Sequence, residues 1–482
     1  MEKTIIIGDG IGGLTTGALL SKHGYKVTVL EGGGEVGGCA GKFSKDLFSF
    51  PVGATFGMGF EEEGIHNKIL RYLDIDMNVF PLSEAIRITG FSAPLSVFQN
   101  RTNHLKQLVQ VFPHYKENLS SFYEELWKIA RKVRRLIERV PAMPPKTPQE
   151  WEYLFSSLEL SDISLLPLFT KTVADLVKKH DLEDCQSFIH FLDGQIVDSM
   201  QTTTEHCSLL MGAFALDVYH EGSFYVEGGL FILARKLQSF IKHHGGEVKL
   251  HCKAIGVDKR GALFTVEDEY EQRYKAEHVV SNFPLRQLLG LLEERIVQNL
   301  SQKIKDKEQW GAFTMYFALE ERVIPSDSPL FQQVLTGKGV AEGEHVFLSL
   351  SKKGDTLRAP EGYRTLTCST HVKLNGWNDA RKQVLKNKVK ERVRTVFPRF
   401  EEGMVHELSG APEAWEKFVT RREVGGFPQT KENTFFNAVS HRSGVDRLWL
   451  CGDTIFPGGG TIGVSVSGYH VFRFITNYQY SL

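Results

Sequence analysis

The beginning of the chain carries the pattern that most limits how it can fold. An apolar run at residues 4–7 leads into Gly8-x-Gly10-x-x-Gly13, and a stretch of helical character follows at 14–23. In such a strand–turn–helix unit the first glycine permits the tight turn, the second lets the backbone approach phosphate oxygens, and the third allows close helix–strand packing. The amide groups at the start of the helix then face the anion. The pattern therefore predicts a pyrophosphate cradle at the start of an α/β domain.

A second predicted strand, at 27–30, ends at Glu31. A carboxylate in this position can accept hydrogen bonds from the ribose hydroxyls of an adenosine. The alternative interpretation of Glu31 is a solvated strand end. On the N-terminal motif alone, the cofactor is a dinucleotide of either kind, FAD or NAD.

The end of the chain carries a second glycine-rich segment. A predicted strand at 448–450 is followed by Gly452 and Asp453, and a turn at 460–463 opens a final helix. Asp453 is placed to accept hydrogen bonds from a ribityl chain, and the helix N–H groups would face the pyrimidine edge of an isoalloxazine, where reduction places negative charge. Taken alone, Asp453 would be an ordinary helix N-cap. The two glycine-rich segments together predict FAD, bound non-covalently.

Further motifs resemble those of the FAD-containing carotenoid desaturase and carotenoid isomerase family, within the wider flavin amine-oxidase-like superfamily. The matching segments are 31–42, 48–55, 225–230, 276–282, 355–362, 425–429 and 448–468. The resemblance is strong at both ends of the chain and loose at 90–215 and 300–420. It implies an α/β fold in which a Rossmann-like FAD-binding domain of the glutathione-reductase type, with its GxGxxG turn, is interleaved with an α+β substrate domain.

The expected cofactor-binding residues follow from these motifs and this resemblance. They are Gly8, Gly10, Gly12, Gly13, Glu31, Gly37, Gly38, Lys42, Ala54, Thr55, Ala254, Asn282, Gly452, Asp453, Ile462, Gly463 and Val464. The resemblance alone assigns Ala254 a backbone contact with adenine and places Ala54 and Thr55 against the flavin face. No metal ligands are expected, and no catalytic residue is identified.

Three residues depart from the family's pattern. Asp9 stands where a small residue is usual, Cys39 where Arg is common, and Pro51 where Asp is usual. A negative charge at Asp9 would repel a pyrophosphate, so its side chain is expected to point to solvent. Lys42 is expected to offset the missing arginine.

The nucleotide-binding signals recur along the chain instead of forming one block. One dinucleotide domain interrupted twice by another domain explains this spacing better than tandem domains would. We therefore expect a discontinuous FAD-binding domain at 1–90, 215–290 and 440–482. The substrate domain, which would also face a membrane, is expected at 91–214 and 291–439.

Composition narrows the functional class. Lys plus Arg total 57 and Asp plus Glu 58, a net charge of −1, whereas a nucleic-acid binder shows a basic excess. The six cysteines have neither disulfide-framework nor metal-ligand spacing, which is typical of reduced thiols in the cytosol. The nucleotide motif begins at residue 4, leaving no room for a signal peptide, and no apolar run of about 18 residues occurs. We therefore expect a cytoplasmic protein without a nucleic-acid partner, and peripheral membrane association stays open.

One segment bears on membrane association. Residues 122–140 place apolar side chains at helical spacing and basic side chains on the other faces, which predicts an amphipathic basic helix. It is interpreted either as a surface helix docked on the core or as a patch that contacts a membrane. A membrane patch would suit an enzyme whose substrate dissolves in the bilayer.

The predicted function is FAD-dependent oxidation of a long apolar polyene, in carotenoid desaturation or the related isomerisation. An oxidised flavin removes hydride from an allylic carbon, so the protein has to position the polyene and exclude water. Two groups of phenylalanines are interpreted either as core packing or as the lining of an apolar tunnel: Phe48, Phe50, Phe56, Phe60, Phe427, Phe435 and Phe436. The alternatives are another flavin oxidase, such as an amine or porphyrinogen oxidase, and a non-catalytic lipid-escort protein of the same fold.

Overall fold

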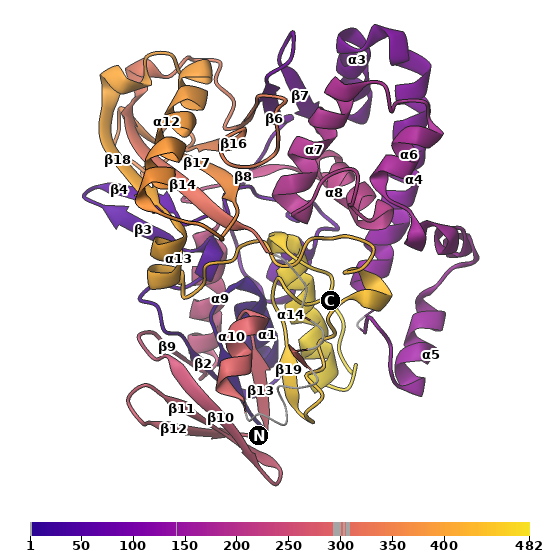
Figure 1. The fold of residues 1–482 in the computed structure, drawn as a ribbon. Helices are drawn as coiled ribbons and strands as arrows, with labels where there is room; N and C mark the ends of the chain where they lie inside the picture. The colour runs from indigo at the N-terminus through magenta and orange to yellow at the C-terminus, as the bar shows by residue number, and fades with distance from the viewer. Residues whose placement is uncertain (1, 141, 293–299, 302–303, 305–308) are drawn as a thin grey trace.

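The computed structural model describes residues 2–140, 142–292, 300–301, 304 and 309–482. Its lower half in Figure 1 is built on a five-stranded parallel sheet with the strand order β19-β13-β1-β2-β9. These strands are β1 (Lys3–Ile7), β2 (Lys26–Leu30), β9 (Glu247–Lys249), β13 (His278–Ser281) and β19 (Leu448–Leu450). All five come from the three segments that were expected to form the FAD-binding domain.

Both faces of the parallel sheet are covered. The covering elements are α1 (Ile11–Lys22), α9 (Phe231–His243), α10 (Leu285–Leu288), α14 (Gly460–Ile475), β10 (Ala254–Arg260), β11 (Leu263–Asp268) and β12 (Arg273–Ala276). Ile6 packs in a core with α1, α9 and α14, whereas Ile5 and Ile7 pack in a second core with the β10-β11-β12 sheet. This burial on both faces is typical of parallel sheets and explains why β1 is apolar along nearly its whole length.

The first and last helices pack backbone to backbone. A Cβ atom on Gly468 of α14 would lie 2.2 Å from the carbonyl oxygen of Gly12 in α1. The Thr16 hydroxyl donates a hydrogen bond to the Gly468 carbonyl at 2.9 Å. The two glycine-rich ends of the chain are therefore joined directly.

A seven-stranded sheet forms a second layer, in the order β18-β14-β17-β16-β15-β6-β7. Its strands are β6 (Glu84–Thr89), β7 (Leu95–Phe98), β14 (Gly311–Glu320), β15 (Phe331–Leu335), β16 (His345–Leu350), β17 (Tyr363–Val372) and β18 (Met404–Gly410). Helix α12 (Asp379–Val396) covers it through Leu385, Val389 and Val393. The strand β6 lies before residue 90 but pairs with β15, so this sheet begins earlier than the predicted domain boundary. Within the predicted substrate segment 291–439, residues 293–299, 302–303 and 305–308 lie outside the described residues.

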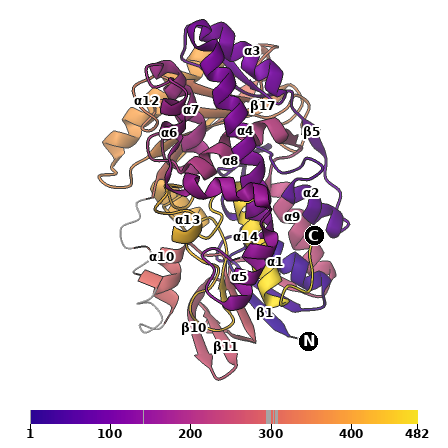
Figure 2. The ribbon, with the colours of Figure 1, turned by 90° about the vertical axis from the view of Figure 1, so that its right-hand side faces the viewer.

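Helices make up the remaining layer (Figures 1 and 2). They are α3 (Arg101–Val111), α4 (Lys116–Arg139), α5 (Pro148–Ser157), α6 (Val173–Lys179), α7 (Gln186–Met200), α8 (Leu209–Glu221) and the 3₁₀ segment η3 (Leu160–Thr170). The predicted amphipathic helix at 122–140 is confirmed as the greater part of α4, which runs along the face shown in Figure 2. Of the helices described, none has both the length and the apolar character needed to cross a bilayer.

Shorter elements complete the described chain. They are β3 (Lys42–Lys45), β4 (Phe48–Pro51), β5 (Val79–Pro81), β8 (Phe224–Val226), α2 (Ile65–Tyr72), α13 (Pro412–Val419) and the 3₁₀ turns η1 (Gly38–Ala40), η2 (Pro113–Tyr115), η4 (Leu289–Leu291), η5 (Glu321–Val323), η6 (Phe400–Gly403) and η7 (Phe435–Asn437). Residues 247–254 do not form one continuous strand, because β9 ends at Lys249 and β10 begins at Ala254. Between them the Cys252 amide donates to the Glu31 carbonyl at 2.7 Å, so the chain turns here to pair with the end of β2.

Candidate cofactor and substrate site

A cavity of about 380 Å³ lies between the β1–α1 turn and the seven-stranded sheet. It is lined by most of the expected cofactor residues: Gly8, Gly10, Gly12, Glu31, Gly37, Gly38, Ala54, Thr55, Asn282, Gly452, Asp453 and Val464. The remaining expected residues lie outside the lining: Gly13, Lys42, Ala254, Ile462 and Gly463. Segments from both ends and the middle of the chain therefore meet at one place.

The turn between β1 and α1 has the close contacts that require glycine. Gly8 has φ of 92°, a backbone conformation that favours glycine. A Cβ atom on Gly13 would lie 2.5 Å from the Gly8 carbonyl oxygen, so Gly13 serves helix–strand packing and not the lining of the cavity. Helix α1 begins after Gly10 without a side-chain cap, which leaves its first N–H groups free for an anion. This geometry fits the pyrophosphate of a dinucleotide.

Asn282, directly after β13, packs between the two glycine-rich segments. Its Nδ2 lies 3.5 Å from the Gly8 carbonyl oxygen. A Cβ atom on Gly12 would lie 2.9 Å from Asn282 Oδ1, and one on Gly452 would lie 3.2 Å from the same atom. Asn282 therefore positions both glycine segments as well as lining the cavity.

Glu31 ends β2 and is held by two backbone donors. Its Oε1 accepts a hydrogen bond from the Gly33 amide at 2.6 Å, and its Oε2 accepts one from the Asp9 amide at 3.0 Å. An ionised carboxylate has about four acceptor positions, so lone pairs remain for ribose hydroxyls. The partly buried side chain lines the cavity, which fits the predicted ribose contact better than a solvated strand end.

The Asp9 side chain does not point to solvent, so that expectation is wrong. Asp9 is fully buried and its carboxyl group contacts that of Glu31. Burial, and then the neighbouring charge of Glu31, raise the pKa of Asp9 well above its usual value. A protonated Asp9 is neutral and would not repel a pyrophosphate. Its Oδ1 accepts from the Gly37 amide at 3.3 Å, and its Oδ2 has no hydrogen-bond partner among the described residues.

Replacing Asp9 by asparagine should raise the thermal stability at pH 7 and change it little near pH 4. The pKa of Asp9 is about 3.9 in the unfolded chain and is raised in the folded protein. Between these two pKa values the folded protein holds a proton that the unfolded chain has lost, so folding takes up a proton. The stability of the wild-type protein therefore falls as the pH rises through this range. Asparagine offers Glu31 a donor without proton uptake. Melting temperatures measured across this range should show a gap that widens with pH. Asp327→Asn is the control and should show no such trend, because the Asp327 side chain is 85% exposed. A gap of constant size between wild-type protein and Asp9→Asn would contradict the raised pKa of Asp9.

A buried arginine that the sequence motifs did not indicate stands beside Asp453. Arg421 follows α13 and lies 2.8 Å from Asp453 Oδ2, and its Nε donates to the Glu423 carbonyl at 2.5 Å. It also lies beside Cys39, the residue that replaces the family's arginine. Lys42 instead places its Nζ 4.8 Å from the centre of the Phe231 ring. Among the described residues that line the cavity, Arg421 is the only lysine or arginine. The expectation that Lys42 offsets the missing arginine is therefore wrong, because Arg421, from a distant part of the chain, supplies the positive charge.

The N-terminus of α14 forms another wall of the cavity. Gly460, Thr461 and Val464 line it, and the helix starts without a side-chain cap. Gly463 faces the protein, because a Cβ atom there would lie 2.4 Å from the Gly458 carbonyl oxygen. The free N–H groups and the positive end of the helix dipole therefore lie at the cavity. This is the position that the sequence predicts for them, facing the part of a flavin that gains negative charge on reduction.

The part of the cavity toward the seven-stranded sheet is mainly apolar. It is lined by Phe56, Met58, Ile86, Ala312, Phe347, Tyr219 and Trp415. Polar side chains lie among them: Asp198, Ser199, Gln201, Thr314, Ser369, Thr370 and His371. Of the phenylalanines interpreted as a tunnel lining, only Phe56 contributes. Phe48 and Phe50 pack against Tyr316 in a separate core, because the β3–β4 hairpin packs on β14 and β17 of the sheet. The tunnel interpretation is therefore wrong for the other six phenylalanines, and for Phe56 it stays a prediction.

Known proteins match almost the whole chain. A prolycopene isomerase from Daucus carota is 26% identical, with 96% of this chain and 78% of the relative covered. A 4,4′-diaponeurosporene oxygenase from Staphylococcus haemolyticus is 22% identical, with 98% and 96% covered. The crystal structure of an oxidoreductase from Methanosarcina mazei superposes with a TM-score of 0.66 at 16% identity, covering 98% of this chain and all of the other. That structural similarity shows a shared fold.

The family described as flavin containing amine oxidoreductase matches residues 11–471. This range includes α1, the whole seven-stranded sheet and nearly all of α14. The match agrees with the glycine cradle, the carboxylate at the end of β2 and the uncapped helix at the cavity, which together fit FAD. The chain belongs to the flavin containing amine oxidoreductase family and is a FAD-dependent oxidoreductase.

Proposed function

We propose that the protein acts on a long apolar polyene, in carotenoid desaturation or isomerisation. The observation that carries this proposal is one cavity that extends from the glycine cradle to the apolar side chains of Phe56, Met58 and Phe347. A long hydrocarbon chain without polar groups is recognised mainly by apolar surface of this kind. Two relatives are named for prolycopene and 4,4′-diaponeurosporene, which are both polyenes.

The residues around the cavity have separable tasks in this proposal. Bound FAD supplies an acceptor for hydride from an allylic carbon. Trp415 and Tyr219 exclude water from the apolar part of the cavity, and the N–H groups at Gly460 and Thr461 face a group that gains negative charge on reduction. The chain therefore positions both reactants and supplies the electrostatic stabilisation.

Product analysis tests the proposal. Purified protein loaded with FAD should convert polyenes in cis or all-trans form, presented in liposomes, to products that chromatography separates. Amines belong in the same panel, because the Asp198 carboxylate in the cavity would suit a cationic substrate. Oxidation of amines with no polyene converted would overturn the proposal in favour of an amine oxidase. Polyene bound by protein that retains no FAD would overturn it in favour of a lipid-escort role.

Helix α4 is docked on the core. Its apolar side chains, including Leu126 and Val133, are buried. Arg134 pairs with the buried Asp217 at 3.2 Å, and Arg135 pairs with Glu159 at 2.6 Å. Much of the helix's basic charge therefore stabilises the protein itself, so replacing Arg134 or Arg135 would not test membrane contact cleanly.

An exposed apolar surface lies next to α4, and we propose that it is the part that contacts a membrane. Its side chains in η3 are Leu160, Ile163 and Leu166, which are 89%, 58% and 61% exposed. Phe155 on α5 is also exposed, at 64%. The Nζ of Lys132 on α4 donates to the Ser161 carbonyl at 2.6 Å, so the basic helix holds η3 in place. Exposed apolar residues beside a basic helix face suit the interface of an anionic bilayer.

Replacing Leu160, Ile163 and Leu166 by serine should release the protein from anionic liposomes. Burying one such side chain is worth about 1.5–3 kcal/mol, so losing three should lower the bound fraction by far more than tenfold. Co-sedimentation with vesicles measures the effect, and the FAD content should stay constant. Leu47→Ser with Leu357→Ser is the matched control, at side chains that are 78% and 55% exposed on other elements. Undiminished pelleting of the triple variant would rule out this surface as the membrane contact.

A further inference from the structure

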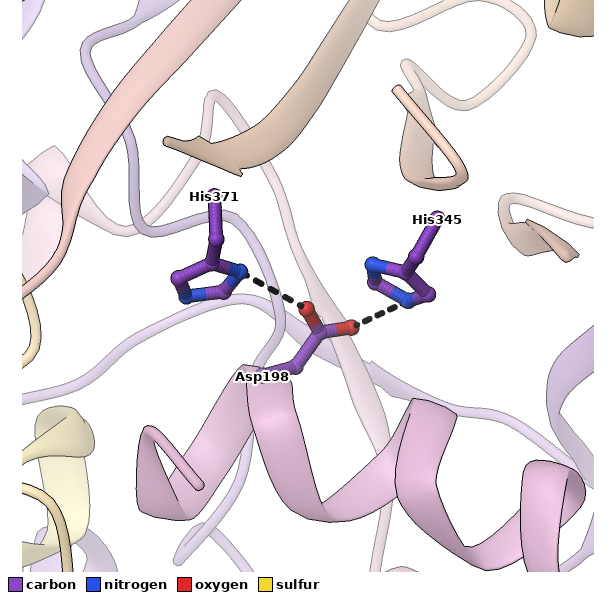
Figure 3. A group of neighbouring side chains, drawn as sticks. All are labelled: Asp198, His345 and His371. Atoms are coloured by element: carbon purple, nitrogen blue, oxygen red, sulfur yellow. Dashed lines mark ion pairs between the residues drawn. The ribbon is translucent and has the colours of Figure 1, made fainter. Parts of the chain in front are cut away.

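Three side chains from distant parts of the chain meet at the end of the cavity that lies toward the seven-stranded sheet. Asp198 is on the last turn of α7, His345 begins β16, and His371 is next to the end of β17. In the antiparallel register of β16 and β17, Phe347 pairs with Ser369. Continuing this register places His345, two residues before Phe347, opposite His371, two residues after Ser369. Their side chains therefore lie on the same face of the sheet, and both rings point toward the Asp198 carboxylate (Figure 3).

The contacts within this group are too long to be good hydrogen bonds. His345 Nε2 lies 3.4 Å from Asp198 Oδ2, and His371 Nδ1 lies 3.9 Å from Asp198 Oδ1. Both nitrogens of His345, and His371 Nδ1, are buried without a hydrogen-bond partner among the described residues. Buried polar atoms in native proteins almost always have a partner, so His345 Nε2 and His371 Nδ1, which face Asp198, point to one that occupies the space between the side chains.

The spacing suits a metal ion. The three ligand atoms all lie within 4.8 Å of one another. Two atoms bound to a Zn²⁺ ion at 2.0–2.1 Å with a tetrahedral angle are about 3.4 Å apart. The His345–Asp198 distance of 3.4 Å equals this value, and the His371–Asp198 distance of 3.9 Å is slightly longer.

A fourth residue orients the carboxylate. The Gln333 amide on β15 donates to Asp198 Oδ2 at 2.6 Å and to the Gly194 carbonyl at 3.1 Å. Such outer hydrogen bonds typically fix the carboxylate ligands of metal sites. One oxygen of Asp198 is thereby held, and the other faces His371.

We propose that Asp198, His345 and His371 bind one divalent transition-metal ion, with Zn²⁺ and Fe²⁺ as the fitting ions. Two histidines and one carboxylate are the ligand set of many catalytic zinc sites and of non-haem ferrous sites. Asp198 and His371 also line the cavity, so the open coordination position faces its interior. A water molecule or an oxygen atom of the cavity's occupant can fill that position.

Metal content of the intact, FAD-loaded protein tests the proposal. After incubation with Zn²⁺ and removal of free metal, elemental analysis should find about one equivalent per chain. Co²⁺ in place of Zn²⁺ should add visible absorption bands outside the flavin spectrum. Less than a tenth of an equivalent of either ion in the wild-type protein would overturn the proposal and leave a buried polar cluster only.

Variants place the ion. Asp198→Asn and His371→Gln should each weaken Zn²⁺ binding at least tenfold, while the FAD spectrum reports that the protein is folded. Asp46→Asn is the matched control, because Asp46 also faces one histidine, His406 at 3.1 Å, but lies outside the group. If Asp198→Asn does not fold, His345→Gln takes its place. Equal Zn²⁺ affinity in the wild-type protein and the variants would overturn the assignment.

Discussion

Substituting valine for Gly10 should leave the purified protein folded but with less than about a tenth of the wild-type FAD, a loss of more than 1.4 kcal/mol in binding. A Cβ atom at Gly10 would lie 2.6 Å from the Asn282 Nδ2, on the wall of the cavity. The valine side chain would therefore occupy the space in which the backbone approaches the pyrophosphate. The flavin absorbance of the purified protein, relative to its protein absorbance, measures the effect.

The fold should tolerate this substitution for two reasons. Gly10 has φ of −58°, which any residue adopts, and the atom it would approach is the end of a side chain that can move. Gly13→Val, in contrast, would place its Cβ 2.5 Å from backbone and should destabilise the domain itself. Gly256→Val is the matched control, because no atom lies within 4 Å of its added Cβ. Stoichiometric FAD in Gly10→Val would refute the placement of the pyrophosphate.

Replacing Arg421 by alanine should cost about 3–5 kcal/mol of stability, because it leaves the charge of Asp453 buried and unpaired. The two side chains are only 11% and 13% exposed. FAD retention should fall as well, since both residues line the cavity and Arg421 is its buried cation. Thermal unfolding and flavin content of the purified variant measure the two effects.

A surface ion pair provides the comparison. Arg235 and Glu35 lie 3.2 Å apart with side chains that are 49% and 43% exposed, so Arg235→Ala should cost less than about 1 kcal/mol. Arg421→Lys keeps the charge but loses the fork of donors that reaches Asp453 and the Glu423 carbonyl, and should be intermediate. An Arg421→Ala protein with wild-type stability and FAD content would show that the pair has no such role.

Local patterns predicted the nucleotide-binding half of the protein well. The strand at β1, the turn from Gly8 to Gly13 and the helix α1 are adjacent in sequence, so each contact that requires glycine could be anticipated from spacing alone. Asp453 and the uncapped start of α14 could be anticipated in the same way. The lengths of β9 and β10 could not, because their break depends on pairing with the distant end of β2.

Which residues face the cavity was less predictable than which segments do. Gly463 and Ile462 belong to the correct turn but point into the protein, since a helix turns successive side chains in different directions. Phe48 and Phe50 lie on strand β4 and pack into a separate core, whereas Phe56 lies beyond that strand and lines the cavity. A resemblance to a family identifies the segment, and only the packing shows the direction of each side chain.

The sequence by itself determined the parallel α/β domain, the cradle for a dinucleotide and the preference for FAD, because short motifs at the two ends of the chain indicate each of them. The tertiary structure alone decided the charges inside the cavity. Asp9 is neutralised by burial beside Glu31, and Arg421 reaches Asp453 from a separate loop. The grouping of Asp198 with His345 and His371 likewise depends on strand register and on the position of α7. Burial and long-range proximity set these properties, and neither can be read from the spacing of residues along the chain.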